Sequence, residues 1–306
     1  MGSRIAQALE ARPEVELVIG VDTSEPLLPL QHTEFVKADS SLGVLRSVMH
    51  AASVDTVVHA GLVVNSTRSN SESLYDINVI GTMNVLAAAE AAESSIRKLV
   101  VKTSTLVYGT NFDDPYFFRE GTHPTHPPTT PVERSLVEVD ALVQDFADDN
   151  TDIAVTSLRL TEMLGEDRTS TFSAVLRMPV VPEIFGFDPR LQFIDEDDAV
   201  RAIEFATLDH VPGTFNVAGP GTITWSEACT ILGKRRVAIP PLMTEIAVRP
   251  LRTLGRVDIP SDVLRLLRYG RGVDTTAYVE RGFEYRYTTR ETVDAFARLC
   301  HNPCHR

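Results

Sequence analysis

Val54-Asp-Thr-Val-Val-His-Ala60 is a short apolar run rich in valine, and it predicts a strand buried on both faces. A helical pattern follows from Leu74 to Ala92. Its centre reads Asn78-Val-Ile-Gly-Thr-Met-Asn-Val-Leu86 and repeats apolar residues at helical spacing. A buried strand followed by a long helix is the unit from which parallel α/β sheets are built. These two neighbouring segments therefore predict an α/β fold.

The same alternation continues on both sides of this unit. It predicts further strands at residues 15–21, 98–103 and 153–158, and further helices at residues 4–11, 44–52 and 132–146. Such a pattern is typical of a doubly wound parallel sheet, which we expect to occupy residues 1–158. Prolines break up residues 159–306, which are expected to form a smaller substrate-binding lobe with segments returning to the sheet. Helices are predicted there at 261–268 and 289–299, with Ser261 and Thr289 as N-caps.

Composition and charge exclude several classes of protein. The formal net charge of −13 argues against a general binder of nucleic acid or of anionic membranes. Three cysteines are too few for a disulfide framework, and the terminal Cys300–His305 tract has no second ligand cluster, so no metal site is expected. We find no signal peptide and no apolar run of the about 18 residues that a membrane span needs. A cytoplasmic location is the expectation.

Further motifs follow one another in a fixed order. They are Met1-Gly-Ser-Arg-Ile-Ala6, Asn78–Leu86, Thr103-Ser-Thr-Leu-Val-Tyr-Gly109, Phe193-Ile-Asp-Glu-Asp-Asp-Ala199 and Phe215-Asn-Val-Ala-Gly219. In these motifs the chain resembles, over nearly its whole length, the NAD-dependent epimerase/dehydratase family of extended short-chain dehydrogenases/reductases. The resemblance implies a Rossmann-like fold, a bound NAD, a nucleotide-sugar-like substrate, and an oxidoreductase or isomerase activity.

The resemblance also implies a set of cofactor-binding residues. Gly2 matches the last glycine of the family's phosphate-binding turn, and Asp22 ends a strand 20 residues later, where an acid binds the adenosine ribose. The negative charge of Asp22 would repel a 2′-phosphate, which favours NAD over NADP. The other implied positions are Asp39, His59, Ala60, Gly61, Asn78 and Thr103.

The front of the chain departs from the family pattern. A complete member begins with a strand and a glycine-rich turn, and the amides of that turn receive the cofactor pyrophosphate at a helix N-terminus. This strand would lie between the strands predicted at 15–21 and 54–60. We expect that the start has been placed too late and that the chain from Met1 binds NAD weakly.

The second departure is chemical. Val132 and Leu136 stand where the family has its catalytic Tyr and the Lys one helical turn later, and neither aliphatic side chain can exchange a proton. The catalytic serine is retained as Ser104. Tyr108 and Glu162 are candidates for relocated acid/base groups, and Glu162 stands where the family has an asparagine that meets the substrate. Tyr116 and Glu133 are further candidates.

Two functions therefore remain open at this stage. One is an enzyme of this family with relocated or impaired acid/base catalysis; the other is a non-catalytic NAD-binding regulatory or interaction protein. Arg268 and Arg271, in a basic late segment, are candidates for holding the phosphate end of an anionic substrate, or are ordinary surface arginines. The expected partner is a small molecule rather than nucleic acid or membrane, and the resemblance allows a homodimer.

Overall fold

In the computed structural model, the described residues are 1–64, 71–91, 94–166, 171–241, 259 and 261–301. A parallel sheet of four strands forms the centre of the molecule, in the order β10-β5-β4-β3. The strands are β3 (Thr56–His59), β4 (Lys98–Ser104), β5 (Ala154–Leu160) and β10 (Gly213–Val217). Every neighbouring pair is parallel, so the carboxyl ends of these strands meet at one edge of the sheet.

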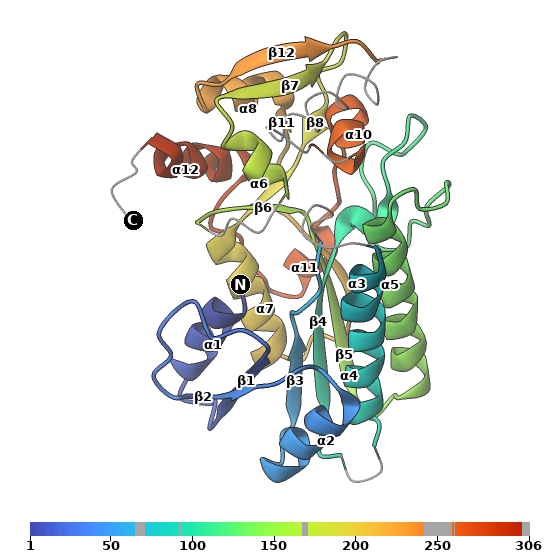
Figure 1. The fold of residues 1–306 in the computed structure, drawn as a ribbon, viewed down its shortest axis with the longest axis vertical. Coiled ribbons are helices and arrows are strands. Elements are labelled where there is room, and N and C mark those ends of the chain that lie inside the picture. The colour runs from blue at the N-terminus through green and yellow to red at the C-terminus, as the bar shows by residue number, and fades with distance from the viewer. Residues whose placement is uncertain (65–70, 92–93, 167–170, 242–258, 260, 302–306) are drawn as a thin grey trace.

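Helices cover both faces of this sheet (Figure 1). The helices α2 (Leu42–Ala51), α4 (Gly81–Ala89) and α5 (Pro131–Asp149) share one core with Leu99 and Val101 of β4. The helices α1 (Gly2–Glu10) and α7 (Glu196–Leu208) share another core with Val100. Since successive side chains of a strand point to opposite faces, the apolar run of β4 supplies both cores. The predicted doubly wound, Rossmann-like sheet is confirmed.

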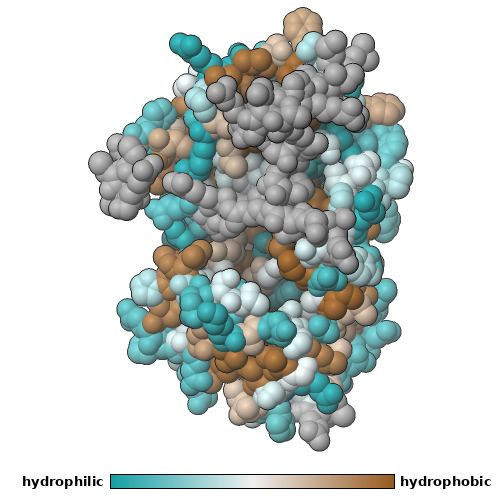
Figure 2. Space-filling view, viewed as in Figure 1, coloured by the Kyte–Doolittle hydropathy of each residue, from teal (hydrophilic) through white to brown (hydrophobic). Residues whose placement is uncertain are grey.

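The first two strands form a separate parallel pair. They are β1 (Val18–Asp22) and β2 (Thr33–Lys37). Among the strands of the described residues, β1 pairs only with β2 and β3 only with β4, so no strand occupies the place that we expected to lie between β1 and β3. Val18 and Val58 remain only partly buried against the core that α1 and α7 cover. Figure 2 shows apolar surface on this face, over the region around β3.

The later part of the chain adds short elements around a core of its own, in which Phe172 packs against Phe193 and Trp225. Among its described residues there are three two-stranded sheets: β6 (Glu162–Leu164) with β9 (Phe193–Asp195), β7 (Val180–Ile184) with β12 (Arg235–Ile239), and β8 (Arg190–Leu191) with β11 (Ile223–Thr224). Its helices are α6 (Thr171–Leu176), α8 (Trp225–Ile231), α10 (Ser261–Tyr269), α11 (Thr276–Glu280) and α12 (Thr289–His301). From this later part, β10 and α7 return to the central sheet.

Two helix predictions differ from the structure in detail. The helix predicted over 74–92 is divided into α3 (Ser71–Tyr75), a π-helical turn η1 (Asp76–Ile80) and α4. Such π-turns are frequently found at functional sites, and this one contains Asn78. The cap predicted for Thr289 is supplied by Thr288 instead, whose hydroxyl accepts from the Glu291 amide at 3.2 Å while the Glu291 carboxylate accepts from the Thr288 amide.

A buried ionic network joins α5 to the sheet. Arg159 of β5 donates to both carboxylate oxygens of Asp140 on α5, at 2.9 and 2.5 Å. The same guanidinium donates to the Tyr108 hydroxyl at 2.8 Å, and that hydroxyl donates to the Asn216 amide oxygen on β10 at 2.8 Å. The Tyr108 ring is stacked on Phe118. Burial raises the pKa of Tyr108, and Arg159 opposes this rise only in part, so the phenol is neutral at pH 7.

Asp140→Ala is expected to lower the free energy of unfolding by about 3 kcal/mol, because it leaves the Arg159 guanidinium buried without its anion. Urea unfolding followed by circular dichroism measures the change. Asp145→Ala, at an exposed position of the same helix, is the matched control and should change the free energy by less than about 0.5 kcal/mol. Equal effects of the two substitutions would contradict a structural role for the Arg159–Asp140 pair.

Candidate functional site

The residues predicted to hold the cofactor follow the carboxyl ends of their strands or open a helix. Gly2 is the first residue of α1, Asp22 is the last residue of β1, and His59 is the last residue of β3. Asp39 follows β2 by two residues, and Thr103 is the penultimate residue of β4. In open parallel α/β sheets, ligands bind in the crevice outside these ends.

Several of these positions leave room and hydrogen-bonding capacity for a dinucleotide. A Cβ atom added to Gly2 or Gly61 would meet no atom within 4 Å. The exposed Asp22 uses one carboxylate oxygen to accept from the Ser24 amide at 2.8 Å. Hydrogen bonds from Ser41 lower the pKa of Asp39, so that carboxylate is charged at neutral pH. The Thr103 hydroxyl is buried and has no hydrogen-bond partner in the described part of the chain. These features fit the adenosine and ribose groups of a nicotinamide dinucleotide.

Two of the predicted cofactor residues also hold the chain together locally. The Asn78 side chain accepts from the Val63 amide at 2.7 Å and donates to the Val63 carbonyl at 2.9 Å and to the Ser135 hydroxyl at 3.0 Å. It therefore ties the loop after β3 to α5. His59 lies 2.9 Å from the Thr82 hydroxyl. Burial, together with the nearby charge of Lys102, lowers the pKa of His59 to about 4, so its ring is neutral at pH 7.

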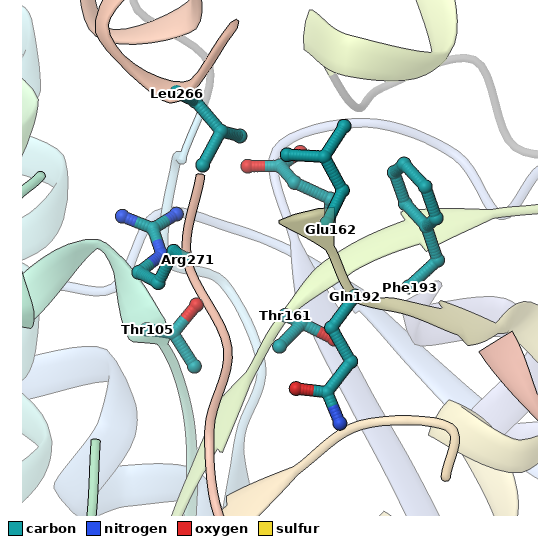
Figure 3. A pocket seen from close by; sticks show the side chains of 8 residues that line it. Thr105, Thr161, Glu162, Gln192, Phe193, Leu266 and Arg271 are labelled. Carbon is teal, nitrogen blue, oxygen red and sulfur yellow. The ribbon is translucent and has the colours of Figure 1, made fainter. Parts of the chain in front are cut away.

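A small pocket lies where the late segment of the chain meets the ends of β4 and β5 (Figure 3). Its lining residues are Thr105, Thr161, Glu162, Leu191, Gln192, Phe193, Leu266 and Arg271. Figure 3 shows the Glu162 carboxylate directed toward the side of the pocket where Arg271 lies. The buried Thr105 hydroxyl has no hydrogen-bond partner within the described residues. Glu162 is the single residue of this lining with a carboxyl group, which can carry a proton.

Arg271 is 8% exposed and is held in this pocket by the backbone around it. Its Nη1 donates to the Gly109 carbonyl at 3.1 Å and to the Thr110 hydroxyl at 3.2 Å. The preceding residue, Gly270, has φ +74° and lies so close to Arg190 that a Cβ atom there would clash with its carbonyl oxygen. Burial lowers the pKa of Arg271, and the carboxylate of Glu162 opposes this decrease. An arginine at this position stays charged and is suited to an anionic group.

The positions of the family's Tyr and Lys are sealed in the core. Val132 and Leu136 are both 0% exposed and pack in the same core as Leu62 and Leu106. The Ser104 hydroxyl accepts from the Leu106 amide at 3.2 Å and so caps a short 3-10 turn, η2 (Thr105–Tyr108). Neither Ser104 nor Tyr108 lines the pocket around Glu162.

The remaining candidates are spread over several places. Glu133 forms the capping box of α5 with Thr130, and the Tyr116 side chain is 63% exposed. The Arg268 guanidinium lies over the rings of Phe187 and Tyr269 rather than in the pocket, which separates it from Arg271.

Our sequence reasoning missed three polar residues near this region. Thr105 follows Ser104 directly, and Lys102 interrupts an otherwise apolar part of β4, so both carried a signal in the sequence. Arg265 carried no such signal in the sequence, because an arginine within a predicted helix is ordinary. It donates to the Thr110 carbonyl at 3.0 Å and to the Thr129 hydroxyl, and it lines a second cavity of about 320 Å³ beside the loop of Pro124–Pro128.

The described residues contain neither a metal-binding cluster nor a membrane-spanning helix. They contain no group of three or more His, Cys, Asp or Glu side chains that could bind a metal ion; Cys304 and His305 lie outside them. No helix in the same ranges is long and apolar enough to cross a membrane.

Comparison with known proteins agrees with this geometry. The sequence model of the NAD dependent epimerase/dehydratase family matches residues 1–218. An uncharacterized protein of Mycobacterium tuberculosis is 34% identical over 308 residues, which cover 97% of this chain and 81% of that protein. A UDP-glucose 4-epimerase of Yersinia pestis is 33% identical over 104 residues, covering 33% of this chain and 29% of that protein.

Solved structures share the fold at low identity. UDP-glucuronic acid 4-epimerase from Bacillus cereus in complex with NAD has a TM-score of 0.73 at 15% identity, covering 98% of this chain and 95% of that chain. UDP-glucose 4-epimerase from Thermotoga maritima with UDP-glucose has a TM-score of 0.73 at 17% identity, with the same two coverages. The chain therefore belongs to the NAD dependent epimerase/dehydratase family.

Proposed function

We propose that this protein binds NAD and acts on a nucleotide-sugar-like substrate, with acid/base catalysis relocated to the pocket around Glu162. One observation carries the proposal: the pocket presents a carboxylate and a buried guanidinium, whereas the Tyr and Lys positions of the family are filled by buried aliphatic side chains. The chemistry is therefore expected to come from a different part of the same crevice.

The cofactor part of the proposal is supported by the open space at Gly61 and by the placement of Asp22 and Thr103 at strand ends. Relatives of the same fold have been solved with NAD. When bound, NAD would accept and return a hydride from the substrate. The chain's own part is to orient the two molecules and to hold a proton at the Glu162 carboxylate.

The substrate part of the proposal depends on Arg271. Its guanidinium is buried beside the Thr105 hydroxyl and is suited to a phosphate or carboxylate through bidentate hydrogen bonds. The related epimerase from Thermotoga maritima was solved with UDP-glucose, a nucleotide sugar with a diphosphate. Glu162 beside this arginine would disfavour a second negative group, so we place the sugar hydroxyls next to the carboxylate and the anionic group next to Arg271.

A non-catalytic NAD-binding regulator is the second candidate. It is favoured by the same core positions, because Val132 and Leu136 are fully buried and leave no proton carrier on this face of α5. The two candidates differ in one measurable respect. An enzyme converts a nucleotide sugar or changes the redox state of NAD, whereas a regulator only binds them.

Asp22→Ser is expected to reduce the preference for NAD over NADP by about tenfold, or about 1.4 kcal/mol, because it removes the charge that repels a 2′-phosphate. Calorimetric titration with both dinucleotides gives the ratio of the two affinities. Asp55→Ser, just before the amino end of β3, is the control and should leave the ratio unchanged. An unchanged ratio in Asp22→Ser would mean that this carboxylate does not face the ribose.

Glu162→Gln is expected to reduce turnover of UDP-glucose in the presence of NAD by about 10²–10⁴-fold, because the amide keeps the shape of the side chain but cannot exchange a proton. Product formation is followed by nuclear magnetic resonance and cofactor reduction by absorbance. Glu183→Gln, on β7 and outside the pocket, is the control. Binding of UDP-glucose and NAD without any turnover by the unmodified protein would favour the regulator over the enzyme.

A homodimer and a cytoplasmic location complete the proposal. Four large apolar side chains are exposed along η1 and its two flanking helices: Tyr75, Ile77, Ile80 and Met83, with exposures of 39–46%. Exposed apolar side chains gathered on one helical segment mark an interaction surface. The Tyr75 hydroxyl also donates to Glu138 on α5, so this surface continues from η1 onto α5. We propose that a second copy of this chain binds to this helical surface.

Met83→Glu is expected to convert the dimer to a monomer at micromolar concentration, because a carboxylate would be buried in an apolar interface. Light scattering coupled to size-exclusion chromatography measures the mass. Leu27→Glu, at an apolar side chain that is 86% exposed outside this face, is the control. A monomeric unmodified protein would exclude this use of the surface.

A further inference from the structure

Lys102 is an unusual residue for its place in the fold. It lies in β4, which pairs with a strand on each side, so the backbone around it is inside the sheet. Its neighbours Val100 and Val101 are 0% and 1% exposed. Strands in such sheets are near-continuous hydrophobic runs, and a lysine within one must keep its ammonium in contact with polar groups or solvent.

The position of Lys102 along β4 directs it toward the cofactor edge. Side chains alternate along a strand, so Lys102 and Ser104 point to the same face as Val100. Only Thr103 and Ser104 follow Lys102 before the strand ends. At the opposite end of the same strand, Lys98 is held by the carbonyl oxygens of Thr207 and Asp209, at 2.7 and 3.0 Å. The two lysines of β4 therefore serve opposite edges of the sheet.

The Lys102 ammonium reaches the turn that follows β3. Its Nζ lies 3.5 Å from the carbonyl oxygen of Leu62, directly after the His59-Ala60-Gly61 turn. Gly61 in this turn has open space where a side chain would be. The ammonium is thus next to the backbone that we propose to contact the dinucleotide.

Beside the His59-Ala60-Gly61 turn, neither His59 nor the helix α5 supplies a positive charge. His59 is neutral at pH 7, and Leu136 of α5 is an aliphatic side chain in the core. Arg159 is engaged by Asp140 and Tyr108. Lys102 of β4 therefore brings a positive charge next to this turn, at the Leu62 carbonyl.

We propose that Lys102 is a positioning residue for the dinucleotide, and that its ammonium binds the ribose and adjacent phosphate on the nicotinamide side. This inference rests on the proposed NAD binding. The adenosine half is served by Asp22 and Asp39, from β1 and the end of β2, and does not involve Lys102.

The test uses NADH and AMP as probes, because AMP carries only the adenosine half of the dinucleotide. Lys102→Met is expected to weaken NADH binding by tenfold or more, measured by fluorescence titration, and to leave the affinity for AMP within twofold, measured by calorimetry. The dependence of the NADH dissociation constant on salt should also become shallower, since one ionic contact is lost. Lys102→Arg should retain NADH affinity within about threefold because the positive charge is kept.

Lys98→Met is the matched control, with the same chemical change on the same strand at the opposite edge, and should bind NADH like the unmodified protein. Thermal unfolding of each variant identifies those that are folded. Unchanged NADH affinity in folded Lys102→Met would overturn the inference while NAD binding stands. An equal loss of NADH and AMP would overturn it too, by showing a general distortion of the site. If the unmodified protein bound neither probe, the proposed NAD binding would fail, and this inference with it.

Discussion

The geometry of the crevice depends on the hydrogen bonds that the buried guanidinium of Arg159 makes. This guanidinium joins β5 to Asp140 of α5 and to Tyr108 after β4, and through Tyr108 it reaches Asn216 of β10. Because a buried charge without its partner is very costly, these elements cannot shift separately. Glu162 follows Arg159 by three residues, so the pocket lies just beyond this network along the chain. Tyr108 has a structural place in this network, with its hydroxyl committed on both sides.

Val132 and Leu136 on α5 affect the packing of the core as well as the supply of groups that can carry a proton. Val132 and Leu136 belong to the core beneath the crevice, where they pack with Leu62 and Leu106. Restoring Tyr and Lys there would bring an ammonium into an apolar region whose neighbours no longer solvate it. Polar side chains near the carboxyl ends of β4 and β5 lie on the strands and on the late segment, at Lys102, Glu162 and Arg271.

Sequence patterns predicted the central strands closely, since the expected run 98–103 became β4 (Lys98–Ser104) and the expected run 153–158 became β5 (Ala154–Leu160). The strand β2 was not predicted, because Thr33-Glu-Phe-Val-Lys37 contains only two apolar residues, which are adjacent and so show no alternation. The pocket could be predicted only in part. Glu162 followed from a motif, but the separation of Arg271 from Arg268 depends on the close approach of Gly270 to Arg190, and no local pattern encodes that contact.

In the part of the chain that the structure describes, the edge of β1 away from β2 and the edge of β3 away from β4 pair with no strand, and this has a consequence in concentrated solution. Backbone amides and carbonyls along these edges have no strand partner among the described residues, and Val18 and Val58 beside them are only partly buried. An extended segment that entered between the two strands would gain a ladder on both of its sides at once, whereas an ordinary sheet edge offers one. The space between the edges of β1 and β3 can therefore bind an extended segment of another chain. Resistance of this protein to aggregation depends on how well these two edges are shielded from other chains.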